Sequence, residues 1–336
     1  QLQRRFMVPF QGGQDGKHVS KIALVGKSLK QNNSFGLDFT DSTSDGVIAY
    51  KKAINALSNQ DEFDINLLTM PGIITDFAPS VITHAINKTE QRGDCFLIFD
   101  VAKYNDSPTQ TVSTIISDAV TDAANYDSSY AGTYFPWLMY NDAVNNIVTP
   151  LPPSAVMPSV FAGNDASAEP WFAPAGLNRG LLTAITEATT RLTHAERDEL
   201  YEGRVNPIAT FPNQGVCVWG QKTLQKKRSA LDRINVRRLL IALKKFIAST
   251  SRFLVFEQNT AATRNRFLGT VNPYLESVQQ RSGLHAFKVV MDETNNTPDV
   301  VDRNKLVGNI MIQPTRTAEF IVLDFTVLPT GATFPE

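Results

Sequence analysis

Apolar and polar positions along the first 125 residues follow two different periods. Apolar runs of strand length span residues 2–10, 21–25, 65–70 and 95–101. Apolar residues recur at helical spacing over residues 45–57, 77–89 and 109–124. Ser44 stands where it can cap the first of these helices. Pro71-Gly72 is expected to end the strand at residues 65–70. This alternation predicts a three-layer α/β unit built on a mainly parallel sheet.

The pattern changes after residue 125. Residues 129–138 form an aromatic run typical of a strand, and six prolines follow between Pro150 and Pro174. Proline lacks an N–H group and clashes with the preceding turn of a helix. We therefore expect residues 150–174 to form an ordered loop laid over the first domain.

Residues 170–180 hold two prolines and two glycines, which interrupt both helix and strand. Trp171 and Phe172 add large apolar side chains that a surface loop would not normally carry. We expect a packed joint between a domain at residues 1–180 and a domain at residues 181–336. The joint residues are Trp171, Phe172, Pro174, Gly176 and Arg179.

The second half has a charge asymmetry centred on one helical pattern, at residues 235–249. Between Lys222 and Arg252 there are ten Lys or Arg residues and a single acid, Asp232. Five cations lie along the flank of the apolar stripe: Arg233, Arg237, Arg238, Lys244 and Lys245. A solvated amphipathic helix is the simplest interpretation. Nucleic-acid binding is a second one, although neither interleaved aromatic residues nor a nucleic-acid module accompanies the charges.

The other elements expected after the joint are shorter. Residues 193–196 form a capping-box motif, and Gly203 is placed to end the helix it opens. Strands are expected at residues 215–220, 253–259, 286–292, 305–313 and 319–327, with a helix over 262–281 interrupted near Pro273. The segment after Val327 has no covering partner left in the chain, so we expect a terminal arm that pairs with another subunit. The arm residues are Phe325, Val327, Leu328 and Phe334.

Composition describes an ordinary globular protein. The chain has 336 residues, 42% of them hydrophobic, and a net charge of −1, which points to no partner by charge alone. Cys95 and Cys217 lie in apolar runs and are expected to be buried free thiols, which suits a reducing compartment. No apolar run is long enough to cross a bilayer. The chain opens at Gln1 without an initiator Met, so we expect sequence upstream.

Candidate chemistry is sparse. Gly26-Lys27-Ser28 after a strand imitates the end of a phosphate-binding loop, but Lys21 occupies the position where that loop needs a glycine. Asp100 imitates a magnesium-binding carboxylate at a strand end. The four histidines have no ligand spacing, and no nucleophile and base can be paired from spacing. A cytosolic α/β nucleotide-dependent enzyme stays open as an alternative function.

Several short motifs occur in an order that resembles the tail sheath proteins of contractile phages. They are a Gly-Gly-x-Asp-Gly turn at residues 12–16, an aromatic strand ending in Pro-Trp at 129–137, a Pro-Pro-Ser step at 152–154, a Trp, Ala-Pro-Ala-Gly and Arg-Gly joint at 171–180, a Gly-x-x-x-Trp-Gly strand at 215–220, an Asn-Val-Arg-Arg helix at 235–238 and a Val-Phe-Glu-x-Asn turn at 255–259. Gln258 replaces the usual Pro, and Lys222 stands where Arg is commoner.

The resemblance implies an α/β (α+β) fold. A middle sheath domain is followed by an inner assembly domain with an extended terminal arm, and the chain looks like the C-terminal portion of the family. The implied role is structural, not enzymatic, and needs no cofactor: copies polymerise helically around a tail tube and contract to drive it through the host envelope. Expected partners are other sheath subunits, the tail tube protein, and the baseplate and tail terminator proteins, with the basic helix facing the tube. The implied location is the virion tail, assembled in the host cytoplasm, without nucleic-acid contact or membrane insertion.

Overall fold

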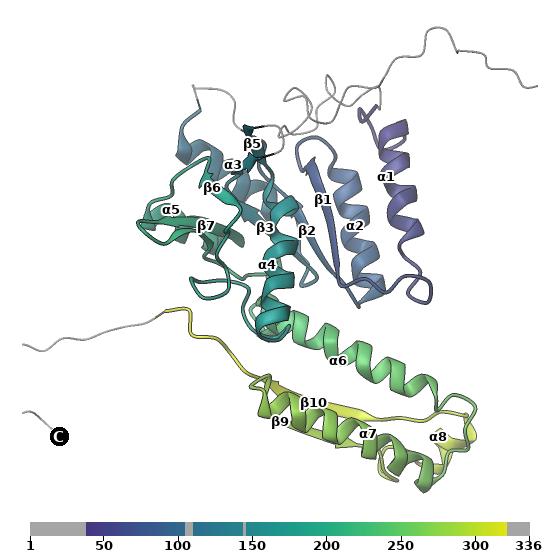
Figure 1. The fold of residues 1–336 in the computed structure, drawn as a ribbon. Helices are drawn as coiled ribbons and strands as arrows, with labels where there is room; N and C mark the ends of the chain where they lie inside the picture. Colours follow the sequence, from purple (N-terminus) through teal and green to yellow (C-terminus); the bar gives the residue numbers. More distant parts are fainter. Residues whose placement is uncertain (1–37, 105–109, 144–145, 321–336) are drawn as a thin grey trace, which may run out of the picture.

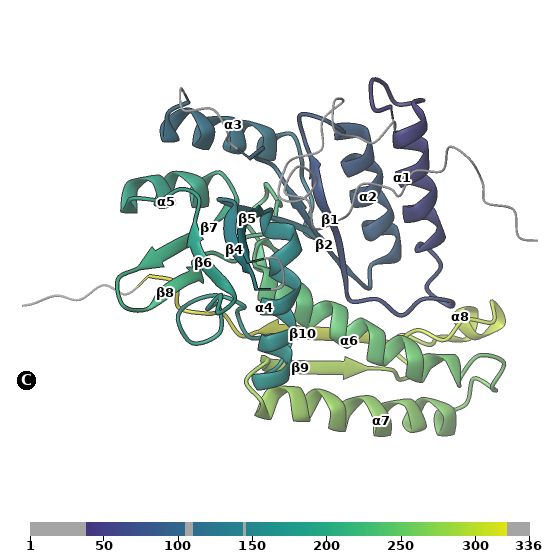
Figure 2. The same cartoon turned by 45° about the horizontal axis from the view of Figure 1, so that its top comes forward.

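The computed structural model describes residues 38–104, 110–143 and 146–320. Figures 1 and 2 show a sheet covered by helices and, beside it, a second unit in which helices α6 and α7 lie along a strand pair. The predicted strands at residues 2–10 and 21–25 and the Gly-Gly turn at 12–16 lie outside the described residues.

A five-stranded sheet in the order β1-β2-β3-β7-β8 forms the centre of the first unit. Its strands are β1 (Leu67–Ile74), β2 (Phe96–Asp100), β3 (Ala131–Phe135), β7 (Val205–Phe211) and β8 (Gly215–Val218). The first four run parallel and β8 pairs antiparallel with β7. Every residue of β2 and β3 is buried, as expected of parallel strands that are covered on both faces.

Helices cover both faces of this sheet. On one side are α1 (Asp45–Ala56), α2 (Pro79–Arg92), α3 (Val112–Ala124) and α5 (His194–Glu202), which share a core with Leu97 and Phe99. On the other side, α4 (Pro153–Ser167) and the start of α6 (Ile234–Arg252) pack with Phe96 and Ile98. Alternate residues of β2 thus point into two different cores, which confirms the predicted three-layer architecture.

The sequence prediction was wrong at two stretches that contain proline. β1 does not end at Pro71-Gly72 but continues to Ile74, with a register irregularity against β2 after Thr69. Residues 153–167 form helix α4 and not a loop. Pro153 occupies the first turn of α4, where its missing N–H costs nothing, so Pro158 is the one residue that removes a helical hydrogen bond. Packing of α4 on the sheet outweighs that loss.

A small antiparallel sheet in the order β5-β4-β6 adjoins α4. It is formed by β4 (Leu138–Asp142), β5 (Ile147–Leu151) and β6 (Ile185–Ala188). The aromatic run at 129–138 therefore divides between β3 and β4 and is not one strand. Thr193 and Glu196 exchange both bonds of the predicted capping box at the start of α5, and Gly203 ends that helix.

The second unit packs α6 and α7 (Ala261–Gln280) with the antiparallel pair β9 (Leu284–Val290) and β10 (Asn309–Pro314), and includes the short helix α8 (Pro298–Asp302). α7 continues through Pro273, contrary to the expected interruption. Residues 253–259 form no strand, because α6 ends at Arg252 and a turn follows. Residues 319 and 320 are not in a strand, and the remainder of the strand predicted at 319–327 lies outside the described residues.

Two observations bear on how the chain divides. β7 and β8 belong to the central sheet, so the first unit extends past the boundary at residue 180 that we expected. α6 belongs to both units: Ile234 and Ile241 lie in the core beside the sheet, while Leu239 and Leu243 lie in the core of the second unit.

Candidate functional site

The predicted joint is centred on Trp171, which is 6% exposed and lies in the core of the second unit. Its indole Nε1 donates a hydrogen bond to the carbonyl of Arg281 at 3.0 Å, and the Arg281 guanidinium lies 5.1 Å from the ring centroid. Asn235 of α6 donates from Nδ2 to the carbonyl of Trp171 at 3.3 Å. Trp171 thus connects the loop between α4 and β6 with α6 and with the end of α7.

The rest of the joint turns the chain back toward the sheet. Gly176 has φ +80° and donates its N–H to the Val218 carbonyl at 2.8 Å, which explains why glycine stands there. Pro174 is buried. Phe172 is half-buried against the second core, and the guanidinium of Arg179 lies over its ring at 5.2 Å. The five predicted joint residues therefore gather around one loop, although the joint does not lie at the end of the first unit.

The basic helix differs from its prediction at Arg237 and Arg238, which are 5% and 6% exposed and so do not lie on a solvated flank. Arg237 lies 4.0 Å above the Tyr130 ring and bonds to the Ser129 hydroxyl. Arg238 pairs with Asp165 and lies 4.8 Å from the Phe161 ring. Both cations are covered because aromatic rings from other elements lie against their guanidinium groups. They are structural residues within this subunit.

The other three cations are also engaged within the chain. Lys245 donates from Nζ to Asp64 Oδ1, to the Ile65 carbonyl and to Asn66 Oδ1 at 2.5–2.8 Å. Arg233 pairs with Glu319. Lys244 is exposed and donates to the Tyr130 hydroxyl at 3.1 Å. Of the five, Lys244 is the one whose charge faces solvent on the helix surface.

A groove of about 1560 Å³ lies at the start of α6, between α5 and the segment at residues 315–320. Six Arg or Lys and four Asp or Glu residues line it, so its charge is mixed with an excess of cations. Its rim carries Trp219, 45% exposed and 4.7 Å edge-on to Phe211, and Phe320, 75% exposed. Sequence reasoning missed this groove, because its lining comes from three separate stretches of the chain, at residues 194–204, 219–236 and 316–320.

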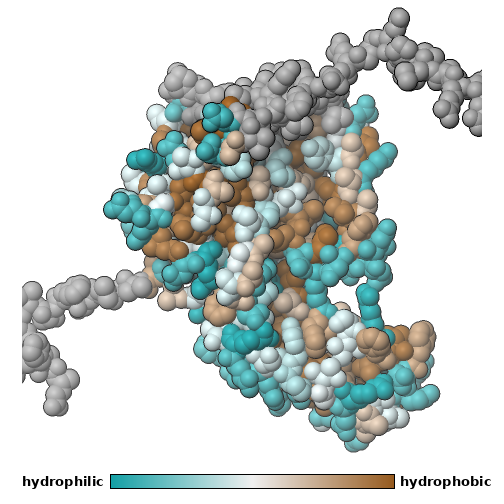
Figure 3. All heavy atoms as spheres, viewed as in Figure 1, coloured by the Kyte–Doolittle hydropathy of each residue, from teal (hydrophilic) through white to brown (hydrophobic). Residues whose placement is uncertain are grey.

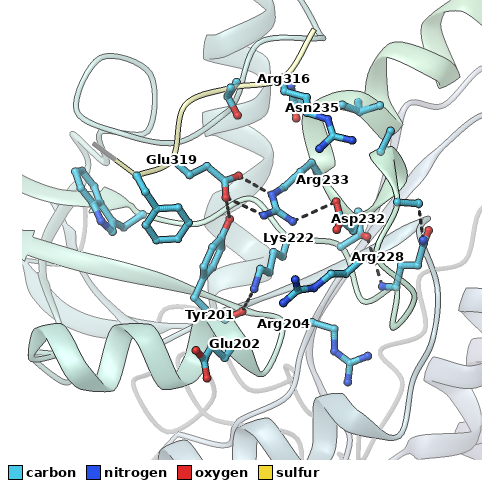
Figure 4. A pocket seen from close by; sticks show the side chains of 18 of the residues that line it. Tyr201, Glu202, Arg204, Lys222, Arg228, Asp232, Arg233, Asn235, Arg316 and Glu319 are labelled. Carbon is cyan, nitrogen blue, oxygen red and sulfur yellow. Dashed lines mark hydrogen bonds and ion pairs between the residues drawn. The ribbon is translucent and has the colours of Figure 1, made fainter. Parts of the chain in front are cut away.

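A carboxylate clamp holds the segment at residues 315–320 across this groove (Figure 4). Glu319 accepts from Arg233 Nε and Nη2 at 2.6 and 2.9 Å and from the Tyr201 hydroxyl at 2.9 Å. Gln221 donates to Glu319 Oε1 at 3.1 Å. Burial, and then the negative charge of Glu319, raise the pKa of Tyr201, so its hydroxyl remains a donor. The clamp fixes the place from which the chain continues toward the predicted arm.

Lys222 contributes to the same cluster. Its Nζ lies 4.2 Å from the Tyr201 ring centroid and donates to the Tyr201 carbonyl at 2.7 Å. Burial and the nearby Arg233 lower the pKa of Lys222. A lysine here therefore supplies a packed, hydrogen-bonded cation and not a solvated one. The arm residues themselves, Phe325, Val327, Leu328 and Phe334, lie outside the described residues.

Asp100, the candidate magnesium ligand, has a structural partner instead. It is buried at the end of β2, accepts from the Ser154 N–H at 3.0 Å and from the Ser154 hydroxyl at 2.5 Å, and thereby caps the first turn of α4. Burial raises the pKa of Asp100 to about 6, while the bonds from Ser154 oppose the shift. Across the described residues, no group of three His, Cys, Asp or Glu side chains could hold a metal ion.

An apolar turn follows the other end of α6. Phe253, Val255 and Phe256 are 81%, 60% and 102% exposed, and Phe256 has φ +70°. Figure 3 shows brown, hydrophobic side chains at the corner of the second unit where Figure 1 places this turn. Contiguous exposed apolar side chains of this kind mark an interaction surface. The strand expected at residues 253–259 is instead an exposed turn, and an apolar pattern alone does not reveal whether a segment is covered.

The β9–β10 pair offers a further place for contact. Its sheet has two strands among the described residues, so neither outer edge carries a strand partner there. Open edges of this kind accept a strand from another chain. Cys95 and Cys217 are buried free thiols, as predicted. In the part of the chain that the structure describes, no helix is both long and apolar enough to span a membrane.

Two family models match the chain in succession. The phage tail sheath protein central domain covers residues 46–224, and the phage tail sheath C-terminal domain covers residues 226–327. The junction of the two matches, at residue 225, lies after the last strand of the central sheet and before α6. It agrees with the extent of the first unit seen in the structure.

Curated relatives are longer proteins. The chain is 38% identical over 222 residues to the tail sheath protein of Vibrio phage KVP40, covering 65% of this chain and 32% of the relative. It is 30% identical over 303 residues to the tail sheath protein of Enterobacteria phage T4, covering 85% of this chain and 45% of the relative. The chain thus spans less than half the length of these relatives.

A solved structure has the same fold over most of the chain. The helical sheath of the anti-feeding prophage in its contracted state superposes with a TM-score of 0.65 at 25% identity, covering 86% of this chain and 75% of that chain. The similarity includes both units described above.

Proposed function

Because this chain belongs to the phage tail sheath family, we propose that it is a structural subunit that polymerises helically around a tail tube and contracts to drive the tube through the host envelope. The comparisons give no support to the alternative of a nucleotide-dependent enzyme. In the proposed mechanism, two packings of the same subunit differ in the surface buried between copies, and this difference supplies the work of contraction.

Two observations support the assembly part of this proposal: the β9–β10 sheet has no third strand among the described residues, and the Glu319 clamp anchors the segment from which the chain continues to the predicted arm. A terminal arm held at such a clamp can add a strand to the sheet of a neighbouring copy. Main-chain hydrogen bonds then fix the register of the link while the clamp keeps its origin in place. Residues Phe325, Val327, Leu328 and Phe334 are proposed to lie in this arm.

Deleting the residues after Val327 in the full-length subunit tests the arm. We expect subunits with unchanged thermal stability that remain monomers in sedimentation and give no tubes in electron microscopy. Lys305→Glu, at an exposed position on the same unit, is the control and should polymerise normally. Polymerisation of the deletion variant would refute the proposal that the terminal arm links neighbouring subunits. Discrete particles from the intact protein, with no tubes or stacked rings, would refute the proposed function.

We also propose that the exposed face of α6 lies against the tube. Since Arg237 and Arg238 are buried, this role falls to Lys244 within the predicted basic set. Lys244→Glu should weaken assembly on tubes without unfolding the subunit, because charge reversal at an exposed interface acts on association. Arg303→Glu, exposed and paired with Asp299 in the same helical turn, is the matched control. If both variants assembled on tubes equally well, the proposal that Lys244 lies against the tube would be refuted.

The remaining partners and the location follow from the same family. The subunit is proposed to contact the baseplate at one end of the sleeve and a tail terminator protein at the other. It would be assembled in the host cytoplasm, in keeping with the buried reduced thiols of Cys95 and Cys217, and would end in the virion tail. No cofactor is required for this role.

A further inference from the structure

Two surfaces that carry exposed aromatic side chains, the groove and the apolar turn, lie at opposite ends of helix α6. The groove is lined by Arg233 and Asn235 at the start of α6, while the turn of Phe253, Val255 and Phe256 follows its last residue. The helix has 19 residues, which corresponds to about 28 Å at 1.5 Å per residue. The two surfaces are therefore separated by about the length of the helix and cannot meet within one subunit.

We propose that the apolar turn of one copy docks into the groove of the next copy, so that subunits associate head to tail along α6. This inference rests on the proposed function in that it requires copies of the chain to associate. It assigns a contact that is distinct from the terminal arm. Two different surfaces on one chain that fit each other give a heterologous contact, which closes into rings or continues as a helix.

The chemistry of the turn is matched by that of the groove. Phe256 is fully exposed, and the next residue, Glu257, has an ion pair with Arg266 at 3.7 Å in which both side chains are about half exposed. Such a pair holds its carboxylate weakly. The groove offers aromatic surface at Trp219 and an exposed cation at Arg228. An aromatic side chain followed by a carboxylate therefore suits a site that combines an aromatic rim with an excess of cations.

The backbone of the turn supports a binding role. Phe256 adopts φ +70°, a region that a bulky side chain rarely occupies, although the side chain gains no burial within its own subunit. Strained residues that gain nothing locally are typical of contact sites. A tube could cover the turn but would leave the groove unexplained, whereas a second copy accounts for both surfaces.

The first experiment replaces Phe256 by Ser in the full-length subunit. Because this side chain is fully exposed, thermal stability should stay unchanged while the critical concentration for tube formation rises at least tenfold. Val148→Ser, at a position 52% exposed on the small sheet of the first unit, is the control and should assemble normally. Unchanged assembly of F256S would overturn the inference.

The second experiment tests whether the turn of a second copy occupies the groove. Subunits carrying both F256C and R228C are assembled and treated with copper phenanthroline, which oxidises two neighbouring thiols to a disulfide. A ladder of covalent oligomers is expected, while each single variant should give none, since Cys95 and Cys217 are buried. A dimer from F256C alone would mean that two turns meet, and coupling of F256C to a tube protein would identify the tube as the occupant. Either result overturns the proposal.

The two failures can be told apart. Tubes that form normally but yield no ladder would overturn the head-to-tail contact and leave the sheath function intact. An intact protein that forms no tubes would refute the sheath function, and the contact with it.

Discussion

Replacing Trp171 by Ala should unfold the second unit more readily than any other single change in the joint. The indole is 6% exposed and packs among Val278, Leu275 and the backbone at Gly283, where an added Cβ would lie 3.1 Å from the ring. Truncating a buried Trp costs about 3 to 5 kcal/mol through lost burial and the cavity left behind. The Arg281 carbonyl also loses its indole donor, which adds about 1 kcal/mol.

The expected loss of unfolding free energy is therefore about 4 to 6 kcal/mol. With an m-value of about 3 kcal/mol per molar urea, the unfolding midpoint should fall by about 1.3 to 2 M. Trp171→Phe is the matched control: it keeps most of the packing and loses the hydrogen bond, so its cost should be about 1 to 2 kcal/mol. Circular dichroism follows the midpoint, and amide hydrogen exchange in α7 should rise before exchange in β2.

Two results would refute this reasoning. If Trp171→Ala left the urea midpoint unchanged, the indole would not be buried between the loop and α7. If Trp171→Phe cost as much as Trp171→Ala, the hydrogen bond to Arg281 and not the packing would hold the joint.

Three further predictions concern buried groups. The pKa of Asp100 is about 6 in the folded state, above the value of 3.8 for a free carboxyl, so the folded state binds this proton more tightly than the unfolded state does. The stability that the bound proton contributes is therefore fully present below pH 4 and is lost as the pH rises through 6. Between pH 4 and pH 6 the loss of stability amounts to about 2 to 3 kcal/mol. Asp100→Asn should remove that part of the pH dependence of the urea midpoint. A variant whose midpoint depends on pH as the wild type's does would contradict the prediction. Burial raises the pKa of both Cys95 and Cys217 to about 11, so neither thiol should react with a disulfide reagent at pH 8 until the protein unfolds, and rapid labelling of the native protein would contradict their burial. Arg237→Glu should destabilise the subunit by at least about 3 kcal/mol, because it places an unpaired acid against the Tyr130 ring; a thermal midpoint equal to that of the wild type would show that the side chain can leave its site.

Much of the first unit could be predicted from local pattern. The run at residues 95–101 is apolar on both faces, which only a strand covered on both sides explains, and helical spacing fixed α2 and α3 to within a few residues. Proline positions were less informative, since the cost of Pro158 is one hydrogen bond and packing of α4 on the sheet exceeds it. Propensity predicts local preference, and tertiary burial decides the outcome.

The candidate surfaces could not be predicted in the same way. Arg237 and Arg238 follow a helical pattern that suggests a solvated flank, but the rings that cover them belong to Tyr130 and Phe161, which lie more than 70 residues away in sequence. The Glu319 clamp joins residues separated by 86 and 118 positions, for which a single sequence gives no signal. Contacts between distant segments are thus what the structure adds.

Helix α6 has a mechanical consequence. It contains neither proline nor glycine; Ile234 and Ile241 are fixed in the core beside the sheet, and Leu239 and Leu243 are fixed in the core of the second unit. A helix packed between two cores acts as a stiff lever, and bending it would break packing in both cores at once. A displacement applied to the second unit would therefore turn the whole subunit. A change in sleeve length would then have to occur at the contacts between subunits and not within them.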